Sequence, residues 1–461
     1  MAQPQPLVVQ PGTFQPLGSF QATPSGQTIA GIIRNTVHFP FRKVEIKRRQ
    51  DSDGLYEANW FDITKFVTRF GSLQTSVDDE RINQFVHSGV QLSVRNDWGE
   101  FNPEHDGGSL FFGFLTRYRT KVRVSAGYTD GSGNSFPSVT TQGVFILDGE
   151  IISNVPKNDT SLKCKSIISP FEETRANEVT GITSSMTSSE IMEKIRDASD
   201  GSGNVLFRQW ISASSWDITP TTNIITGLGT STSLDDFTTW DLMNQLAEVE
   251  GFVVNATREG GLVFGNRNPN TDTSQFSLYG SGYRRPNIIK FRSAKEAVNK
   301  LFTFVRFKYL DPDTTTSIVE NGTQTVIDPG SLEWKYGRNT LELENTFFSD
   351  TATVNRIVAE LNNEFSNLRV EAEIDCVFLP QIEILDRVDV SYREGSLNSV
   401  MLWDMKTWSS DTASDIDPGR LVWASETSST IDYSKKNFKV ISRKTNLDTF
   451  VTTLKLREVE N

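Results

Sequence analysis

The sequence predicts a mainly β protein with an α+β insertion, in which two β-barrel domains flank a small α+β module and an extended N-terminal arm precedes them. Its 461 residues exceed what one hydrophobic core organises and indicate about three structural units. Apolar and polar residues alternate with period 2 in many short stretches, as in half-buried strands. Helical periodicity is confined to a few segments, mostly in the middle third of the chain.

Residues 1–34 are expected to form the extended arm. The stretch from Met1 to Ile33 has no charged residue and is interrupted by Pro4, Pro6, Pro11, Pro16 and Pro24. Such a segment buries too little apolar surface by itself to offset the entropy of ordering it. We expect a neighbouring subunit to order the arm; the alternative is that it packs back on its own domain.

Residues 35–170 are predicted to form the first β-barrel domain. The stretch 38–50 alternates as a half-buried strand does, with Val44 and Ile46 on the apolar face. Its charged face carries Lys43, Glu45, Lys47 and Arg49. Further strand patterns, separated by turn sequences, lie at residues 90–94, 119–128, 143–152 and 161–168. The unit is either an antiparallel barrel or a sandwich.

Residues 171–287 are predicted to form the α+β module. Thr187 and Glu190 have the spacing of a capping box and precede a helix at residues 188–198. A second helix is expected at residues 239–250, with Thr238 as N-cap and Gly251 as its stop. A β-hairpin follows, with strands at 252–257 and 262–264.

Residues 288–461 are predicted to form the second β-barrel domain with one helix. Strand patterns lie at residues 300–310, 331–336, 369–378, 387–392, 437–442 and 450–456. The helix is expected at residues 351–366, with Asp350 as its N-cap. Its apolar stripe has helical spacing and consists of Val354, Ile357, Val358, Leu361 and Phe365.

Composition excludes several functional classes. A net charge of −12 and a pI near 5.0 argue against a general nucleic-acid-binding role for the whole surface. Two cysteines, Cys164 and Cys376, are too few and too far apart in sequence for a disulfide scaffold or a zinc knuckle, and they fit assembly in a reducing cytoplasm. We expect neither a membrane-spanning segment nor a signal peptide.

The sequence contains no recognisable catalytic or metal-binding motif. The histidines are only His38, His87 and His105, and the common metalloprotease, hydrolase and nucleotide-binding motifs are absent. The carboxylate groups at 78–80, 311–313 and 415–417 resemble turn sequences more than glycosidase pairs or calcium ligands. The sequence therefore predicts no catalytic, cofactor-binding or metal-binding residue, and no cofactor.

Two basic clusters interrupt the acidic background. One runs from Arg42 to Arg49, and the other is Arg284-Arg285-Pro286. Each is interpreted either as a contact with an acidic partner subunit or DNA, or as a solvated strand face.

Several segments together resemble the tail hub, or baseplate hub, proteins of tailed bacteriophages. The first domain carries Trp60-Phe-Asp-Ile-Thr64, Gly71-Ser-Leu73 and Val90 through Gly99; the middle module carries Thr239-Trp240-Asp241-Leu242 and Gly261-Leu-Val-Phe264. The last domain carries Glu342-Leu-Glu-Asn345, the helix to Phe365, Leu379 through Val388, Val440-Ile-Ser442 and Leu454 through Glu458. The resemblance covers most of residues 35–460.

The resemblance implies a structural virion protein and not an enzyme. In that family two hub-type barrels per subunit alternate around a channel in a homotrimer, which adapts a sixfold tail tube to a threefold tip or fibre. The implied partners are copies of the chain, the tail tube or distal tail protein, the tape-measure protein and a tail spike or fibre, while DNA passes through without specific binding. The implied location is the tail tip or baseplate of a virion assembled in the host cytoplasm.

Two alternatives remain at this stage. A receptor- or carbohydrate-binding tail component, similar to a distal tail protein, is favoured if Trp98, Trp403, Trp408 and Trp423 line an open groove. A tail-associated peptidoglycan hydrolase is favoured if the chain lyses cell-wall substrate and loses this activity when one carboxylate is replaced.

Overall fold

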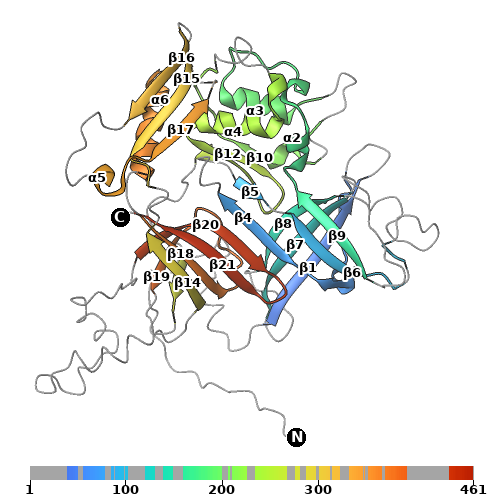
Figure 1. Cartoon of the computed structure of the whole chain (residues 1–461). Coiled ribbons are helices and arrows are strands. Elements are labelled where there is room, and N and C mark those ends of the chain that lie inside the picture. Colours follow the sequence, from blue (N-terminus) through green and yellow to red (C-terminus); the bar gives the residue numbers. More distant parts are fainter. Residues whose placement is uncertain are drawn as a thin grey trace, which may run out of the picture.

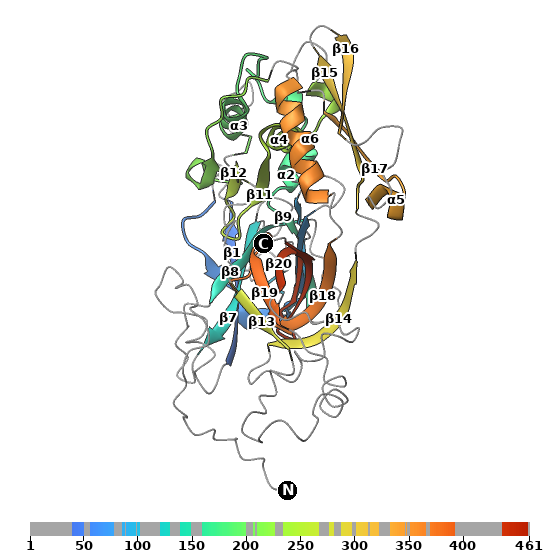
Figure 2. The same ribbon diagram turned by 90° about the vertical axis from the view of Figure 1, so that its left-hand side faces the viewer.

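The computed structural model consists of two large β sheets with an α+β module on one side of them (Figures 1 and 2). It describes residues 39–49, 56–77, 85–87, 89–97, 99–101, 120–129, 139–148, 159–199, 206–207, 210–225, 234–266, 276–280, 287–296, 301–311, 314–321, 332–345, 347, 351–365, 369–391 and 436–459. The arm at residues 1–34 lies outside this part of the chain.

The first sheet has seven strands in the order β2-β1-β7-β8-β9-β6-β3, all antiparallel to their neighbours. The strands are β1 (Phe39–Arg48), β2 (Phe61–Asp62), β3 (Val67–Arg69), β6 (Val90–Arg95), β7 (Thr120–Thr129), β8 (Thr140–Leu147) and β9 (Asp159–Ser166). Val44 and Ile46 are fully buried, as the alternation in β1 predicts. Glu45 is also buried, and its charge is compensated by Arg123 of β7, which pairs with it at 2.6 Å.

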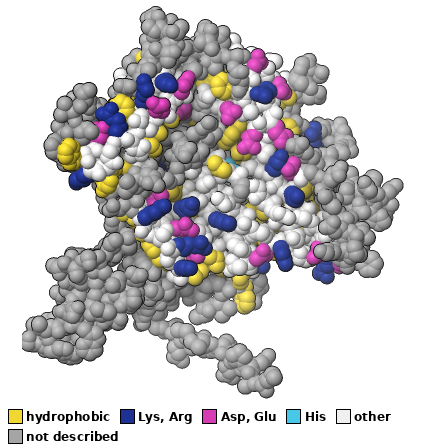
Figure 3. Space-filling model, viewed as in Figure 1, with side chains coloured by type: hydrophobic (Ala, Val, Ile, Leu, Met, Phe, Trp, Pro, Cys, Tyr) yellow, Lys and Arg dark blue, Asp and Glu magenta, His cyan; other side chains and the backbone are white. Residues whose placement is uncertain are grey.

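The second sheet has eight strands and is built mostly from the C-terminal part of the chain. Its main path is β13-β19-β20-β21-β18-β14, and β4 pairs with both β20 and β5. The strands are β4 (Ser72–Val77), β5 (Phe85–His87), β13 (Phe276–Tyr279), β14 (Ile288–Glu296), β18 (Val370–Val377), β19 (Arg387–Ser391), β20 (Lys436–Asn446) and β21 (Val451–Glu458). Its charged side chains form cross-strand pairs, such as Arg292 with Asp375 at 2.8 Å, and Figure 3 shows both signs of charge interspersed on the face viewed.

Strand β4 belongs to the second sheet, whereas residues 35–170 were expected to form one separate domain. The chain turns at Gly71, and β4 then pairs with β20, with Ser72 opposite Asn446. Gly71 has a φ of +68°, and a Cβ there would lie 2.5 Å from the carbonyl oxygen of Gln91. This glycine therefore allows a turn that carries the chain from the first sheet into the second.

The α+β module contains two three-stranded sheets and most of the helices. Its elements are α2 (Ser169–Glu173), η2 (Ala176–Glu178), α3 (Ser188–Arg196), η3 (Ala213–Ser215), β10 (Trp216–Ile218), η4 (Leu234–Asp236), α4 (Thr239–Glu250), β11 (Phe252–Ala256), β12 (Leu262–Asn266), β15 (Phe304–Asp311), β16 (Thr314–Asn321), α5 (Leu332–Tyr336), β17 (Thr340–Asn345) and α6 (Thr351–Phe365). A short 3-10 helix, η1 (Thr64–Phe66), belongs to the first sheet region. None of the described helices is long and apolar enough to cross a membrane.

The predicted helices at 188–198, 239–250 and 351–366 are confirmed as α3, α4 and α6, but α6 lies elsewhere than expected. Val354, Ile357, Val358 and Leu361 of its apolar stripe share one hydrophobic core with α3, α4 and β15, not with the second sheet. Asn345, the last residue of β17, donates a hydrogen bond of 2.8 Å to Glu248 of α4 and adds a polar link. The described elements β15, β16, β17 and α6 thus extend the α+β module instead of belonging to the second sheet.

The strand expected at residues 331–336 is wrong, because this segment forms the short helix α5. Glu333 is buried and accepts a hydrogen bond of 2.6 Å from Nε of Arg338. The amide of Gly337 donates to the carbonyl of Glu333, and Gly337 has a φ of +81°, which ends the helix.

The capping boxes predicted for α3 and α4 are both present. The Oγ1 atom of Thr238 accepts a hydrogen bond from the amide of Asp241 at 3.1 Å, and Thr187 accepts one from Glu190 at 3.3 Å. These bonds satisfy amides that a helix N-terminus otherwise leaves without partners.

We expect Thr238→Ala and Thr187→Ala each to lower the free energy of unfolding by about 1 kcal/mol, since each removes one cap. Urea denaturation followed by circular dichroism measures the change. Thr180→Ala, at an exposed position outside the helices, is the matched control. A loss of assembly at an unchanged melting temperature would show that these threonines do more than cap.

Candidate functional site

The two large sheets share part of one hydrophobic core. Phe378, Leu447 and Phe450 come from the second sheet and its turns, yet they pack within the core of the first sheet. The ring centroids of Phe378 and Phe450 are 5.0 Å apart, and that of Tyr128 in β7 lies 5.7 Å from Phe450. The Tyr128 hydroxyl also donates a hydrogen bond of 2.8 Å to the carbonyl of Phe378. The sheets are therefore joined by burial as well as by strand pairing.

A turn at Asp448 strengthens this joint. Its two carboxylate oxygens accept hydrogen bonds from the amides of Phe70 and Gly71 at 3.0 and 3.2 Å. The guanidinium of Arg42 donates to the Asp448 carbonyl at 2.8 Å and lies 4.8 Å from the ring centroid of Phe450. Residues nearly 400 positions apart in sequence are thus fixed to each other.

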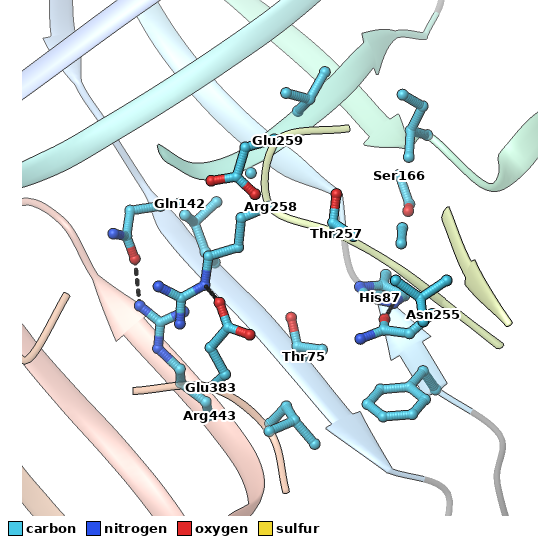
Figure 4. A pocket seen from close by; sticks show the side chains of 18 of the residues that line it. Thr75, His87, Gln142, Ser166, Asn255, Thr257, Arg258, Glu259, Glu383 and Arg443 are labelled. Atoms are coloured by element: carbon cyan, nitrogen blue, oxygen red, sulfur yellow. Dashed lines mark hydrogen bonds and ion pairs between the residues drawn. The ribbon is translucent and has the colours of Figure 1, made fainter. Parts of the chain in front are cut away.

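A cavity of about 380 Å³ lies where the first sheet, the second sheet and the α+β module meet (Figure 4). Its polar walls come from β4 and β5, from β8, from the β11–β12 hairpin, from the turn at residues 383–386 and from β20. The titratable or charged side chains that line it are His87, Arg258, Glu259, Glu383, Asp386 and Arg443. This junction is the candidate functional site.

Arg258 connects the tip of the β11–β12 hairpin to the second sheet region. Its Nε lies 2.9 Å from Oε1 of Glu383, and its other nitrogens donate to the carbonyls of Pro380 and Ile382. Gly260, beside it, has a φ of +83°, and a Cβ there would lie 2.9 Å from the side chain of Val144 in β8. The hairpin tip thus fits closely against the first sheet while Arg258 holds the second.

Arg443 makes the corresponding link from β20 to β8. It is only 7% exposed and donates to Oε1 of Gln142, while the Gln142 amide donates to the Thr140 hydroxyl at 2.7 Å and the Pro380 carbonyl at 3.3 Å. Burial, together with the nearby positive charge of Arg258, lowers the pKa of Arg443 well below its usual value. This link is therefore electrostatically costly and depends on the surrounding carboxylates.

Asp386 is the titratable group of the junction with a pKa near neutrality. Burial raises the pKa of its carboxyl to about 7, although the amide of Glu383 donates to it at 2.7 Å and favours the charged form. Its own carbonyl accepts from the amide of Val440. The charge balance between the two arginines and the carboxylates consequently changes over the physiological pH range.

His87 closes the opposite wall of the cavity. Its Nε2 lies 2.7 Å from Oδ1 of Asn255, so β5 of the second sheet is tied to β11 of the α+β module. Burial lowers the pKa of His87 to about 4, which keeps the ring neutral near pH 7.

The titratable side chains of the junction are held by neighbouring groups. Within the described residues, Glu383 is paired with Arg258, His87 with Asn255, and Asp386 with a backbone amide. The described part of the chain also contains no group of three or more His, Cys, Asp or Glu side chains that could hold a metal ion. Cys164 and Cys376 are buried free thiols, and burial raises the pKa of each.

Many of the residues singled out from the sequence cannot be placed relative to this junction. His38, His105, the basic cluster at 284–286, the carboxylates at 78–80 and 415–417, and Trp98, Trp403, Trp408 and Trp423 lie outside the described residues. Asp311 ends β15, opposite Thr314. The basic stretch from Arg42 to Arg49 lies along β1 and ends one residue after it, where Arg49 forms a bridge with Tyr56.

No protein-family model matches the chain, and no curated protein matches it. Among solved structures, the tail protein from Neisseria meningitidis MC58 matches with a TM-score of 0.50 and 10% identity, over 91% of this chain and 97% of that one. The chain has the fold of a tail protein. The resemblance predicted from the sequence is thereby confirmed at the level of the fold, and so is the mainly β class with a helical insertion.

Two prophage proteins match less closely. The prophage tail protein gp18 from Listeria monocytogenes EGD-e has a TM-score of 0.45 at 12% identity, covering 90% of this chain and 94% of that one. The 43 kDa tail protein of prophage MuSo2 from Shewanella oneidensis has a TM-score of 0.44 at 10% identity, covering 90% and 98%.

Proposed function

We propose that the chain is a structural component of a phage tail or baseplate, located in the virion and assembled in the cytoplasm of the bacterial host. The observation that carries this proposal is the tail-protein fold, which extends over 91% of the chain. A junction in which every module is fixed to the other two fits a load-transmitting part better than a catalyst. The chain is accordingly proposed not to be an enzyme.

The finer role is that of a hub. Copies of the chain form a homotrimer around the DNA channel, and the two β domains of each copy supply six similar positions that meet the sixfold tail tube. The threefold side receives the tail spike or fibre, and the tape-measure protein and DNA pass through during ejection. A net charge of −12 suits such a conduit, because phosphate is not held by carboxylates.

The experiment that tests the hub role is imaging of the purified full chain. Light scattering coupled to size exclusion should give the mass of three copies, and two-dimensional classes should show rings with threefold symmetry and a central opening. A protein that remains a monomer at every concentration, or a ring whose lumen is strongly basic, contradicts the proposal.

The arm gives a separate prediction about assembly. Deleting residues 1–33 is expected to leave the melting temperature of the remaining chain nearly unchanged and to weaken incorporation into particles, since the uncharged, proline-rich segment cannot form a core by itself. Calorimetry and quantification of the protein in purified particles measure the two effects. Unaltered incorporation would refute the assembly role of the arm.

A further inference from the structure

The charged face of β1 contains a like-charged cross-strand pair. Lys47 in β1 is directly opposite Lys121 in β7, a placement that destabilises a sheet when no counter-charge is present. The neighbouring carboxylate, Glu45, is already occupied by Arg123 at 2.6 Å and Lys43 at 2.8 Å. Within the described residues, no carboxylate lies within ion-pair distance of Lys47 or Lys121.

Aromatic rings fix these cations in place. The Lys121 ammonium lies 4.2 Å from the ring centroid of Tyr56, while the Lys47 ammonium and the Arg123 guanidinium lie 5.2 and 4.4 Å from the ring of Trp60. Trp60 also packs on the core of the α+β module, so this frame is held by two parts of the structure. The positive charges therefore cannot easily move apart.

This arrangement disfavours the charged form of both lysines. Burial and the charge of Lys47 lower the pKa of Lys121 to about 8, and burial and the charge of Arg123 lower the pKa of Lys47. An anionic group placed beside the pair would relieve the repulsion and gain charge-assisted hydrogen bonds.

The surroundings favour a protein partner over nucleic acid. Cations already lie over the rings of Tyr56 and Trp60, the aromatic side chains that contact the two lysines, so these rings are engaged in cation–π contacts. Phe39 lies on the same face of β1 and is 47% exposed. At about 3.4 Å per residue, it is about 27 Å from Lys47 along the strand. Lys43 and Lys47 on this face are half-buried, and an exposed aromatic side chain in line with partly exposed basic ones is typical of a protein interface.

We propose that Phe39, Lys43, Lys47 and Lys121, the exposed and half-buried side chains of this face, dock against an acidic surface of a second copy of the chain. The inference rests on the proposed function, in which copies contact one another in a ring. Each copy carries a net charge of −12, so copies repel at long range, and a locally basic contact surface offsets that repulsion.

The test compares self-association of the full chain with that of the double variant Lys47→Gln/Lys121→Gln by sedimentation velocity at low and high salt. We expect the variant to associate at least about tenfold more weakly at low ionic strength and to lose most of the salt dependence. Its melting temperature should be unchanged or higher, because the repulsion is removed, which separates a docking defect from unfolding. Lys163→Gln, at an exposed position of β9, is the matched control and should behave as the wild type.

The outcomes distinguish this inference from the hub role. Association of the double variant equal to that of the wild type overturns the docking surface and leaves the ring intact. A wild type that never associates overturns both. Weaker binding of the variant to a duplex DNA fragment, with self-association unchanged, would assign the lysines to phosphate and also overturn the docking proposal.

Discussion

Replacing Phe378 with alanine is expected to lower the free energy of unfolding by about 3–5 kcal/mol, the range for truncating a buried phenylalanine. Phe378 is 0% exposed and contacts the rings of Phe450 and Tyr128, so its removal leaves a cavity at the point where the two large sheets share a core. The Tyr128 hydroxyl donates to the Phe378 carbonyl, and this bond does not need the side chain. The loss should therefore come from packing.

Urea denaturation followed by tryptophan fluorescence and circular dichroism measures this loss. Val377→Ala is the matched control, because the preceding side chain is 37% exposed and points away from the joint. We expect it to cost less than about 1 kcal/mol. A Phe378→Ala protein as stable as this control would show that the two sheets do not depend on a common core.

The local elements could largely be predicted from the sequence. The alternation in β1 and the capping boxes at Thr187 and Thr238 each depend on a few neighbouring residues, and each was present in the structure. The partners of β4 and α6 could not be predicted. Hydrophobic periodicity shows which face of an element is buried, but not which of several apolar surfaces covers it.

The residues of the junction could not be predicted from hydrophobic periodicity either. Arg443 is in a strand whose alternation buries Phe438 and Val440, so period 2 alone would expose it. A register shift between Val440 and Ser442 reverses the alternation and turns Arg443 inward. A β-bulge has no reliable local sequence pattern, and Arg258 and Asp386 are likewise brought together with Arg443 only by the tertiary fold.

The stability of the chain should depend on the protonation of Asp386. Its pKa is raised to about 7 in the folded protein, so between pH 4 and 7 the folded state holds a proton that the unfolded chain releases. The free energy of unfolding therefore falls as the pH rises through this window. Above pH 7, where Asp386 is ionised, it is lowered by the full amount, at most about 4 kcal/mol. His87 acts in the opposite sense, because its lowered pKa removes stability as the pH falls from about 6.5 to 4.

Asp386→Asn isolates the contribution of Asp386 to the pH dependence of stability, because His87 is the same in both proteins. The side-chain oxygen of the asparagine can still accept the hydrogen bond from the backbone amide of Glu383. We expect the variant to be more stable than the wild type by about 2–4 kcal/mol at pH 8, with the difference shrinking towards zero near pH 4. Urea denaturation across this range measures the difference, with Asp217→Asn at an exposed position of β10 as the control. A difference that is constant with pH would mean that Asp386 stays ionised between pH 4 and 8, and that its negative charge stays beside Arg258 and Arg443 throughout this range.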